Sequence, residues 1–106
     1  MIDEVFEQLK NDSVCESAYQ FSREFLGKSP SYYSVLKARK KQATTDVLFT
    51  LEFALEKKAK EYSSNRYPFF IRTRNHLIQL QKEVRIYREK KIMDDFINFK
   101  KKSYAI

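Results

Sequence analysis

The sequence predicts an all-α protein, and three observations support this prediction. The chain of 106 residues contains one glycine and two prolines, and so few helix breakers favour helices throughout. Apolar residues recur at helical spacing along most of the chain. Nine Phe and seven Tyr, with no Trp, are enough to build one aromatic core, which argues against a disordered chain.

The apolar pattern predicts two short helices in the first quarter of the chain. The first covers residues 2–10. The second covers residues 16–26, and Gly27 ends it because glycine adopts left-handed dihedrals without steric cost. Ser22 on the second helix is small, so a following helix can cross it closely.

A third helix is expected over residues 29–39. Ser29 is a favoured N-cap residue, and Pro30 suits the first turn, where a missing N–H costs nothing. Tyr33 and Leu36 are three residues apart and are expected to face the core. A helix of this length is not stable alone, so these two residues must dock it on its neighbours.

A fourth helix is expected over residues 45–61, after a loop at residues 40–43. Thr44 is its expected N-cap, and residues 63–65 form a linker after it. Six residues are expected to form its broad apolar face: Val47, Leu48, Leu51, Phe53, Ala54 and Leu55.

The last segment begins at Pro68 and contains no further Gly or Pro. One long helix to about residue 102 is therefore one expectation. The other is a break near Met93, with Asp94 capping a short terminal helix.

The net charge of +7 is unevenly distributed along the chain. Residues 28–41 carry five basic residues and no acidic one, and residues 66–106 carry a net charge of +7, whereas residues 1–27 carry −4. A basic surface binds phosphate backbones through counterion release. A solvated lysine-rich surface would have the same composition, and the acid-free segment is what favours nucleic acid.

The residues that carry catalysis or bind metals in other proteins are scattered in this chain. Cys15 is alone and is expected to be a small buried apolar residue. His76 has no Cys or His at metal-ligand spacing, so a surface or helix-packing role is expected. Asp94 and Asp95 favour a helix cap over a catalytic pair. We therefore expect no enzyme activity, no metal and no cofactor.

No apolar stretch approaches the roughly 18 residues of a membrane span. The first residues, Met1 to Glu4, lack the basic-then-apolar pattern of a signal peptide. These observations predict a cytoplasmic protein that does not bind a membrane.

The order of these features resembles the five-helix DNA-binding domain of the Cro/lambda-repressor-like (XRE) family over residues 14–56. Phe21 and Ser22 are similar to the family's apolar-then-small pair, and Gly27 to its turn glycine. The other matching residues are Ser29, Tyr33, Ser34 and Leu36 in the recognition helix and Thr44, Leu48, Leu51, Ala54 and Leu55 in the fourth helix. The resemblance implies a lambda-repressor-like helix-turn-helix domain at residues 1–64 and a C-terminal helical extension at residues 65–106.

Two positions depart from the family pattern. Gly27 lies six residues after Phe21, one more than the family spacing, so a turn lengthened by one residue is expected. Lys37 and Arg39 replace the acidic residue and the glycine that are usual near the end of the recognition helix. These replacements make the helix more basic than is usual in the family.

The resemblance implies that the third helix enters the major groove of double-stranded DNA and reads base edges with its N-terminal part. The residues implicated by position are Ser29, Pro30, Ser31, Tyr32, Ser34 and Val35. Serines can hydrogen-bond to bases and Val35 can contact a thymine methyl, but none offers a bidentate grip. Base readout is therefore expected to be weak, with DNA shape or Arg39 supplying the rest. Tyr32 is also compatible with the edge of the core, and Ser29 with a simple N-cap.

Basic and polar residues around this helix are expected to contact phosphates, which sets affinity and register but not sequence. They are Lys28, Lys37, Arg39, Lys40 and Lys41, with Ser17 and Gln20 near the start of the second helix. A solvated loop remains the alternative for Lys40 and Lys41.

The resemblance also implies a homodimer, because two copies read half-sites one helical turn apart. The expected dimer seam lies on the last segment and consists of Phe69, Phe70, Leu77, Leu80, Val84, Tyr87, Ile92, Phe96 and Phe99. The alternative is that this segment folds back and completes the core. A third interpretation is a second nucleic-acid surface formed by Arg66, Arg72, Arg74, Arg85 and Arg88.

We therefore expect a sequence-specific, dimeric, DNA-binding transcriptional regulator, with a second protein as a further possible partner. The competing interpretation is a helical protein-interaction adaptor or inhibitor, of the phage or polymerase-binding type, that keeps the fold without reading DNA.

Overall fold

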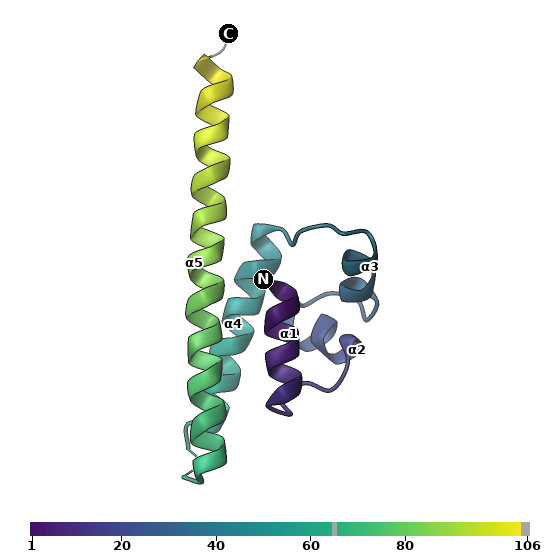
Figure 1. Cartoon of the computed structure of the whole chain (residues 1–106), viewed down its shortest axis with the longest axis vertical. Helices are drawn as coiled ribbons and strands as arrows, with labels where there is room; N and C mark the ends of the chain where they lie inside the picture. Colours follow the sequence, from purple (N-terminus) through teal and green to yellow (C-terminus); the bar gives the residue numbers. More distant parts are fainter. Residues whose placement is uncertain (65, 105–106) are drawn as a thin grey trace.

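Every regular element in the part of the chain that the structure describes is helical, as the sequence predicts. The computed structural model describes residues 1–64 and 66–104, with side chains as far as residue 100. The helices in chain order are α1 (Ile2–Asn11), α2 (Ala18–Gln20), η1 (Phe21–Phe25), α3 (Tyr32–Ala38), α4 (Thr45–Tyr62) and α5 (Pro68–Tyr104) (Figure 1). None of these helices is both long and apolar enough to cross a membrane.

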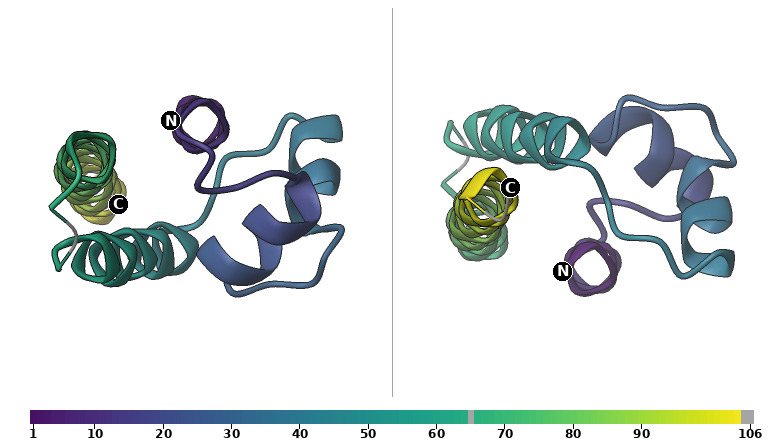
Figure 2. Two further views of the ribbon diagram at one scale, coloured as in Figure 1. Left: turned by 90° about the horizontal axis from the view of Figure 1, so that it is seen from below. Right: turned by 90° about the horizontal axis from the view of Figure 1, so that it is seen from above.

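The helices α4 and α5 run antiparallel and form the spine of the molecule (Figure 1). The group of α2, η1 and α3 lies on the side of α4 away from α5 (Figure 2). The helix α1 lies over α4, between this group and α5. The longest dimension of the molecule is 60 Å, and α5 runs along it.

One hydrophobic core joins the two ends of the chain. It includes Leu9 of α1 and Leu51 of α4, together with Leu77, Leu80 and Val84 of α5. The N-terminal half of α5 therefore folds back on the core, which was one of the two expectations for this segment. Leu77, Leu80 and Val84 are buried in the core of their own chain and therefore do not contact a second copy.

Two element boundaries differ from the expectation. The third helix begins at Tyr32 and not at Ser29, because Pro30 and Ser31 form a turn in which the Ser29 carbonyl accepts the Tyr32 N–H at 3.0 Å. The helix α5 continues through Asp94, so the expected alternative of a break there is wrong. Asn65 of the expected linker lies outside the described residues.

One residue of the expected apolar face of α4 points away from the core. Phe53 is 63 % exposed, whereas Leu51 and Leu55 are fully buried. A side chain two residues from each of these lies on the opposite side of a helix with 3.6 residues per turn. The apolar character of Phe53 therefore does not reflect core packing.

Two polar links fix α5 against the other helices. Buried Glu52 of α4 accepts hydrogen bonds from Arg85 Nε at 2.8 Å and from Arg88 Nε at 2.9 Å. His76 Nδ1 lies 2.9 Å from a carboxylate oxygen of Asp12, just after α1. His76 is thus a helix-packing histidine, as expected, and it belongs to no cluster of metal-binding residues among those described.

Replacing Glu52 with Gln is expected to lower the free energy of unfolding at neutral pH by about 1.5–3 kcal/mol, the usual contribution of hydrogen bonds to a charged group. Burial alone raises the pKa of Glu52, but the hydrogen bonds and charges of Arg85 and Arg88 outweigh it, so the pKa lies below its ordinary value of 4.5. The carboxylate therefore contributes its full stability above that ordinary value and loses it as the pH falls through the lowered pKa. Urea unfolding from about pH 7 to about pH 3 should show the gap between wild type and Glu52→Gln shrinking at acid pH.

The control for this series is Glu56→Gln, one turn further along α4, where Glu56 pairs with Lys60 at 3.5 Å near the surface. That change should alter the unfolding free energy by less than about 0.5 kcal/mol at any pH. A gap for Glu52→Gln that does not vary with pH would contradict the role of the carboxylate charge.

Candidate nucleic-acid interface

The helix α3 is docked through the hydroxyl of Ser22. Ser22 is fully buried in η1, and its Oγ donates to the Ala18 carbonyl at 2.8 Å. The same Oγ accepts the backbone N–H of Tyr33 at 3.0 Å. The small residue expected at this crossing therefore both admits α3 and satisfies a backbone group at its start.

Tyr33 supplies the main apolar anchor of α3. Its ring centroid lies 4.9 Å from that of Phe6 and 5.1 Å from that of Phe21. Its hydroxyl donates a hydrogen bond to the carboxylate of Asp3 on α1. Burial raises the pKa of Tyr33, and the hydrogen bond to Asp3 adds to the rise, so the phenol stays protonated and remains the donor. Tyr33 and Leu36 face inward as expected, with Leu36 half-buried.

A π-helical turn precedes α3. In η1 the Leu26 N–H donates to the Phe21 carbonyl at 3.1 Å, five residues back, where an α-helix would use the residue four back. The extra residue between Phe21 and Gly27 is therefore accommodated inside the helix, and not in the turn as expected. Gly27 has φ of +64°, and a Cβ at that position would lie 3.1 Å from Thr50 Cγ2, so both the backbone conformation and the close contact favour glycine there.

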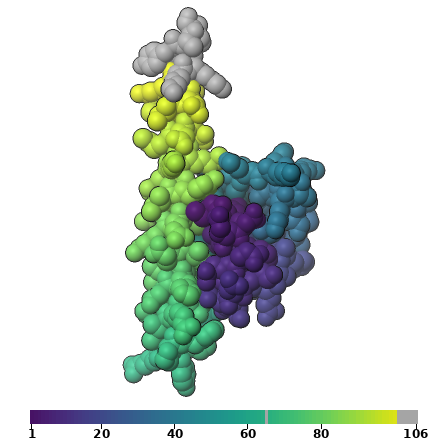
Figure 3. Space-filling view, in the orientation of Figure 1, coloured from purple at the N-terminus to yellow at the C-terminus, as the bar shows by residue number. Residues whose placement is uncertain are grey.

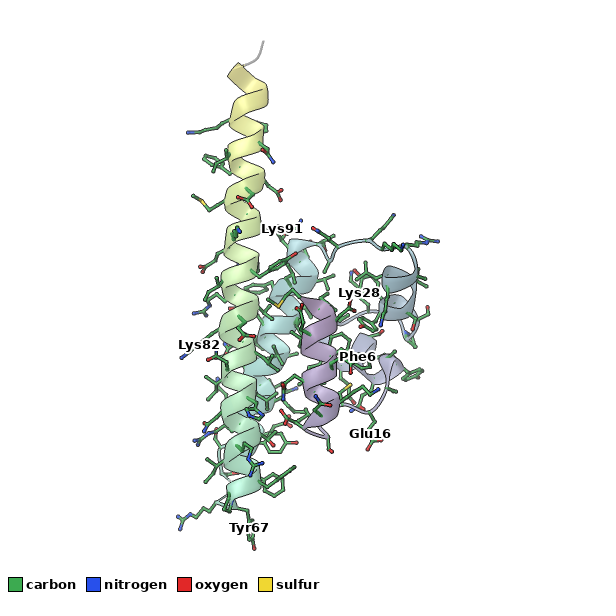
Figure 4. The ribbon with its side chains drawn as sticks, viewed as in Figure 1. Phe6, Glu16, Lys28, Tyr67, Lys82 and Lys91 are labelled. Carbon is green, nitrogen blue, oxygen red and sulfur yellow. The ribbon has the colours of Figure 1, made fainter. Side chains whose placement is uncertain are left out.

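The outer side of α3 and its flanking loops are solvent-exposed. Ser34 and Val35 point outward, and the turn before them is exposed as well. Tyr32 is half-buried against the core, in keeping with the alternative of a core-edge residue, and its ring lies 5.9 Å from Lys28 Nζ. Lys28 lies beside α3 in Figure 4. All five basic residues of the segment 28–41 are exposed: Lys28, Lys37, Arg39, Lys40 and Lys41.

The C-terminal end of α3 places a lysine in a left-handed conformation. The Lys41 N–H donates to the Leu36 carbonyl and the Lys40 N–H to the Lys37 carbonyl, both at 3.1 Å. This is the Schellman arrangement, whose left-handed position is usually glycine. Lys40 occupies that position with φ of +52°. A non-glycine residue there costs about 1 kcal/mol of backbone strain.

Ser17 and Gln20 lie apart from this exposed basic group, at the start of α2. The Ser17 hydroxyl accepts the Gln20 N–H at 3.1 Å, and the Gln20 side-chain oxygen accepts the Glu16 N–H at 3.0 Å. The Gln20 amide nitrogen donates to Glu24 at 2.9 Å. These side chains cap their own helix beside two carboxylates, which gives this end of α2 a less favourable charge for phosphate than the end of α3.

A hollow of about 340 Å³ opens between α1, α3, the loop after α3 and α5. Lys37, Lys40 and Lys41 line it on one side, and Asp3 and Tyr87 line it on others. The basic loop therefore borders a recess as well as bulk solvent.

Two residues that hold this interface carried no functional prediction from the sequence. Asp3 bonds Tyr33 across a separation of 30 residues, and no local pattern in the sequence marks such a pair. Ser22 was expected to matter only because it is small. The signal that could have indicated the role of its hydroxyl is a serine at a buried position of the helix, because a buried hydroxyl needs hydrogen-bond partners.

The fold and this site define an all-helical protein with a short helix that is docked across a preceding helix and flanked by exposed basic residues. Over residues 2–98 the chain matches a family described as a family of unknown function (DUF6626), and it belongs to that family. No curated protein and no solved structure matches the chain.

Replacing Ser22 with Ala is expected to lower the free energy of unfolding by about 1–3 kcal/mol, because the buried N–H of Tyr33 loses its acceptor. Urea unfolding followed by far-UV circular dichroism measures the change. The matched control is Ser34→Ala on the exposed side of α3, which should change the value by less than about 0.5 kcal/mol. Equal stabilities of the two variants would contradict the docking role of the Ser22 hydroxyl.

Proposed function

We propose that the protein is a transcriptional regulator that binds double-stranded DNA through α3 and its flanking loops. The observation that carries this proposal is the exposure of five cations around a helix that is docked in a fixed orientation. Tyr33 docks α3 on Phe6 and Phe21, and the five cations of residues 28–41 are exposed on α3 and its flanking loops, a segment that contains no acidic residue. The resemblance of residues 14–56 to the lambda-repressor-like domain supports the same assignment.

The proposed division of labour follows from side-chain chemistry. The cations bind phosphate oxygens and set affinity and orientation. Ser31, Ser34 and Val35 face the base edges from the N-terminal part of α3, where a hydroxyl can donate or accept and the valine can contact a thymine methyl. None of these groups is bidentate, so sequence specificity depends strongly on the spacing between two half-sites and on DNA shape.

The strained conformation of Lys40 is a second argument for a functional surface. A glycine would satisfy the same hydrogen bonds at the end of α3 without the steric cost of φ near +52°. The lysine keeps a cation beside Lys41 and Arg39 at the edge of the exposed face. Strain that stability does not require is commonly found at functional sites.

The competing function is a protein-interaction adaptor that does not read DNA. The large apolar residues exposed on the C-terminal half of α5 favour this alternative, because exposed apolar surface of that kind marks a contact with another molecule. DNA binding by the isolated protein distinguishes the two functions.

Reversing two charges at the end of α3, with Arg39→Glu and Lys40→Glu, is expected to weaken binding to mixed-sequence duplex DNA about a hundredfold or more at low salt. The slope of log affinity against log salt should fall by about 2, because two phosphate contacts are lost. Fluorescence anisotropy with a labelled duplex measures both quantities, and circular dichroism checks that the fold is kept.

The matched control reverses Arg72 and Lys82, an arginine and a lysine exposed on α5. Similar losses in both double variants would mean that binding is spread over the basic surface, and this would overturn the assignment to α3. Wild-type binding no tighter than that of the Arg39→Glu, Lys40→Glu variant would favour the adaptor. Selection from a random duplex pool tests sequence specificity in the same preparation.

Replacing Lys40 with Gly separates stability from binding. We expect the free energy of unfolding to rise by about 0.5–1 kcal/mol as the left-handed strain is relieved, and DNA affinity to fall as a phosphate contact is lost. Lys41→Gly is the control, because it removes a neighbouring cation at a position without positive φ and should lower affinity without adding stability. A Lys40→Gly variant that binds DNA as tightly as wild type would remove Lys40 from the interface.

A further inference from the structure

The C-terminal end of α5 extends beyond the rest of the molecule (Figures 1 and 3). In Figure 4, Lys91 lies near the level of the first turn of α4, and the helix beyond it stands clear of the other elements. All side chains of residues 92–100 are exposed. Five of them are large and apolar: Ile92, Met93, Phe96, Ile97 and Phe99.

The apolar surface of α5 changes direction where the helix leaves α4. The buried stripe runs through Thr73, Leu77, Leu80 and Val84. Continued at helical spacing it would meet Lys91, Asp95 and Asn98, which are polar. Ile92, Phe96 and Phe99 instead share a face about 100° further around the helix, at 3.6 residues per turn. A stripe that only extended the core contact would not rotate in this way.

The new face adjoins an exposed aromatic flank of α4. Arg85 projects from the same side of α5 as Ile92 and binds Glu52 on α4. The guanidinium of neighbouring Arg88 lies 5.2 Å from the ring centroid of Phe49, which is 58 % exposed. Phe53, one turn further along α4, is also exposed. Apolar surface therefore continues from the projecting end of α5 onto the body of the chain.

We propose that a second copy of this chain covers this face, with the two α5 ends packed antiparallel about a two-fold axis. A crossing near Ile92 and Met93 places Asp95 of one copy beside Lys91 of the other at the edge of this face, so the segment is complementary to itself in charge. It also directs Phe96 and Phe99 of each copy toward the Phe49 flank of the other. Such a two-fold contact is closed, because the same patch serves both copies.

The available area supports a second copy as the occupant. Phe96 and Phe99 are 52 % and 68 % exposed, and together with Ile92 they expose on the order of 350 Å² per copy. Two copies would bury about 700 Å² from these residues, and the exposed Phe49 and Phe53 of each α4 bring the total to roughly 1,200 Å², the lower end of the range of a stable interface. The nine residues of the expected dimer seam thus fall into three groups. Phe69, Ile92, Phe96 and Phe99 are exposed, Phe70 and Tyr87 are half-buried, and Leu77, Leu80 and Val84 serve the core.

The purpose of this dimer rests on the proposed function, because it would present two copies of α3 to two half-sites, but the dimer itself is measured without DNA. Sedimentation equilibrium at micromolar concentration should give about twice the chain mass of 12.8 kDa for wild type. Ile92→Glu and Phe96→Glu should each weaken the dimer about tenfold or more, since each places a charge in the seam.

Ile86→Glu is the matched control, because Ile86 is 66 % exposed and lies about 120° around the same helix from Ile92, outside the face shared by Ile92, Phe96 and Phe99. It should leave the dimer intact, and circular dichroism should show all three variants folded. In a Cys15→Ser background, Ile92→Cys should form a disulfide-linked dimer on mild oxidation, whereas Ile86→Cys should not.

A wild-type protein that is monomeric at about 100 µM, or a dimer that Ile86→Glu disrupts as strongly as Ile92→Glu, would overturn the proposal. A stable dimer that does not bind DNA would leave it standing and remove the DNA-binding function. A monomer that binds DNA would overturn the dimer and leave the DNA-binding function standing.

Discussion

The docking of α3 depends on one residue, Tyr33, which contacts two other helices. Its backbone N–H binds Ser22, its ring packs between Phe6 and Phe21, and its hydroxyl binds Asp3. A helix of seven residues has no stability of its own in water, so these contacts fix both its existence and its rotation. Because Tyr33 points inward, Ser34 and Val35 point outward, and the basic ends of the segment remain in solvent. The outward direction of Ser34 and Val35 is therefore a consequence of aromatic packing on the other side of the same helix.

The pairing of α4 with α5 has a comparable effect on the far side of the molecule. Glu52, Arg85 and Arg88 hold the two helices together at the point where the buried stripe of α5 is about to end. Beyond the first turn of α4, near Lys91, α4 offers no further surface, and the apolar residues of α5 turn to a different face. A stripe directed at the core and a stripe directed elsewhere can share one helix without a break, since side chains rotate by about 100° per residue along it.

The sequence predicted the helices well because helical spacing is a local signal. It placed the start of α3 at Ser29, since Ser-Pro is compatible with both a helix start and a turn, and only the docking of Tyr33 selects between them. The apolar repeat through Leu77 and Val84 was equally compatible with a dimer seam and with folding back, because a stripe does not identify its partner. Asp3, the hydroxyl role of Ser22 and the π-helical turn depend on contacts across the chain, and no local pattern encodes them. The five cations of residues 28–41 are exposed, as predicted from the sequence, because charged side chains are rarely buried.

Strained or irregular backbone is unevenly distributed along the chain. Among the described residues, positive φ outside glycine occurs only at Ser13 and Lys40. The π-helical turn lies in η1, directly before α3. The spine of α4 and α5, which contributes much of the buried core, has neither feature. Both Lys40 and the π-helical turn adjust the helix that presents the basic face, and the strain at Lys40 persists because Tyr33 and the core behind it hold α3 in position. Ser13 closes α1 through the same pair of hydrogen bonds that Lys40 makes at the end of α3, and Lys40 differs in also placing an exposed cation there.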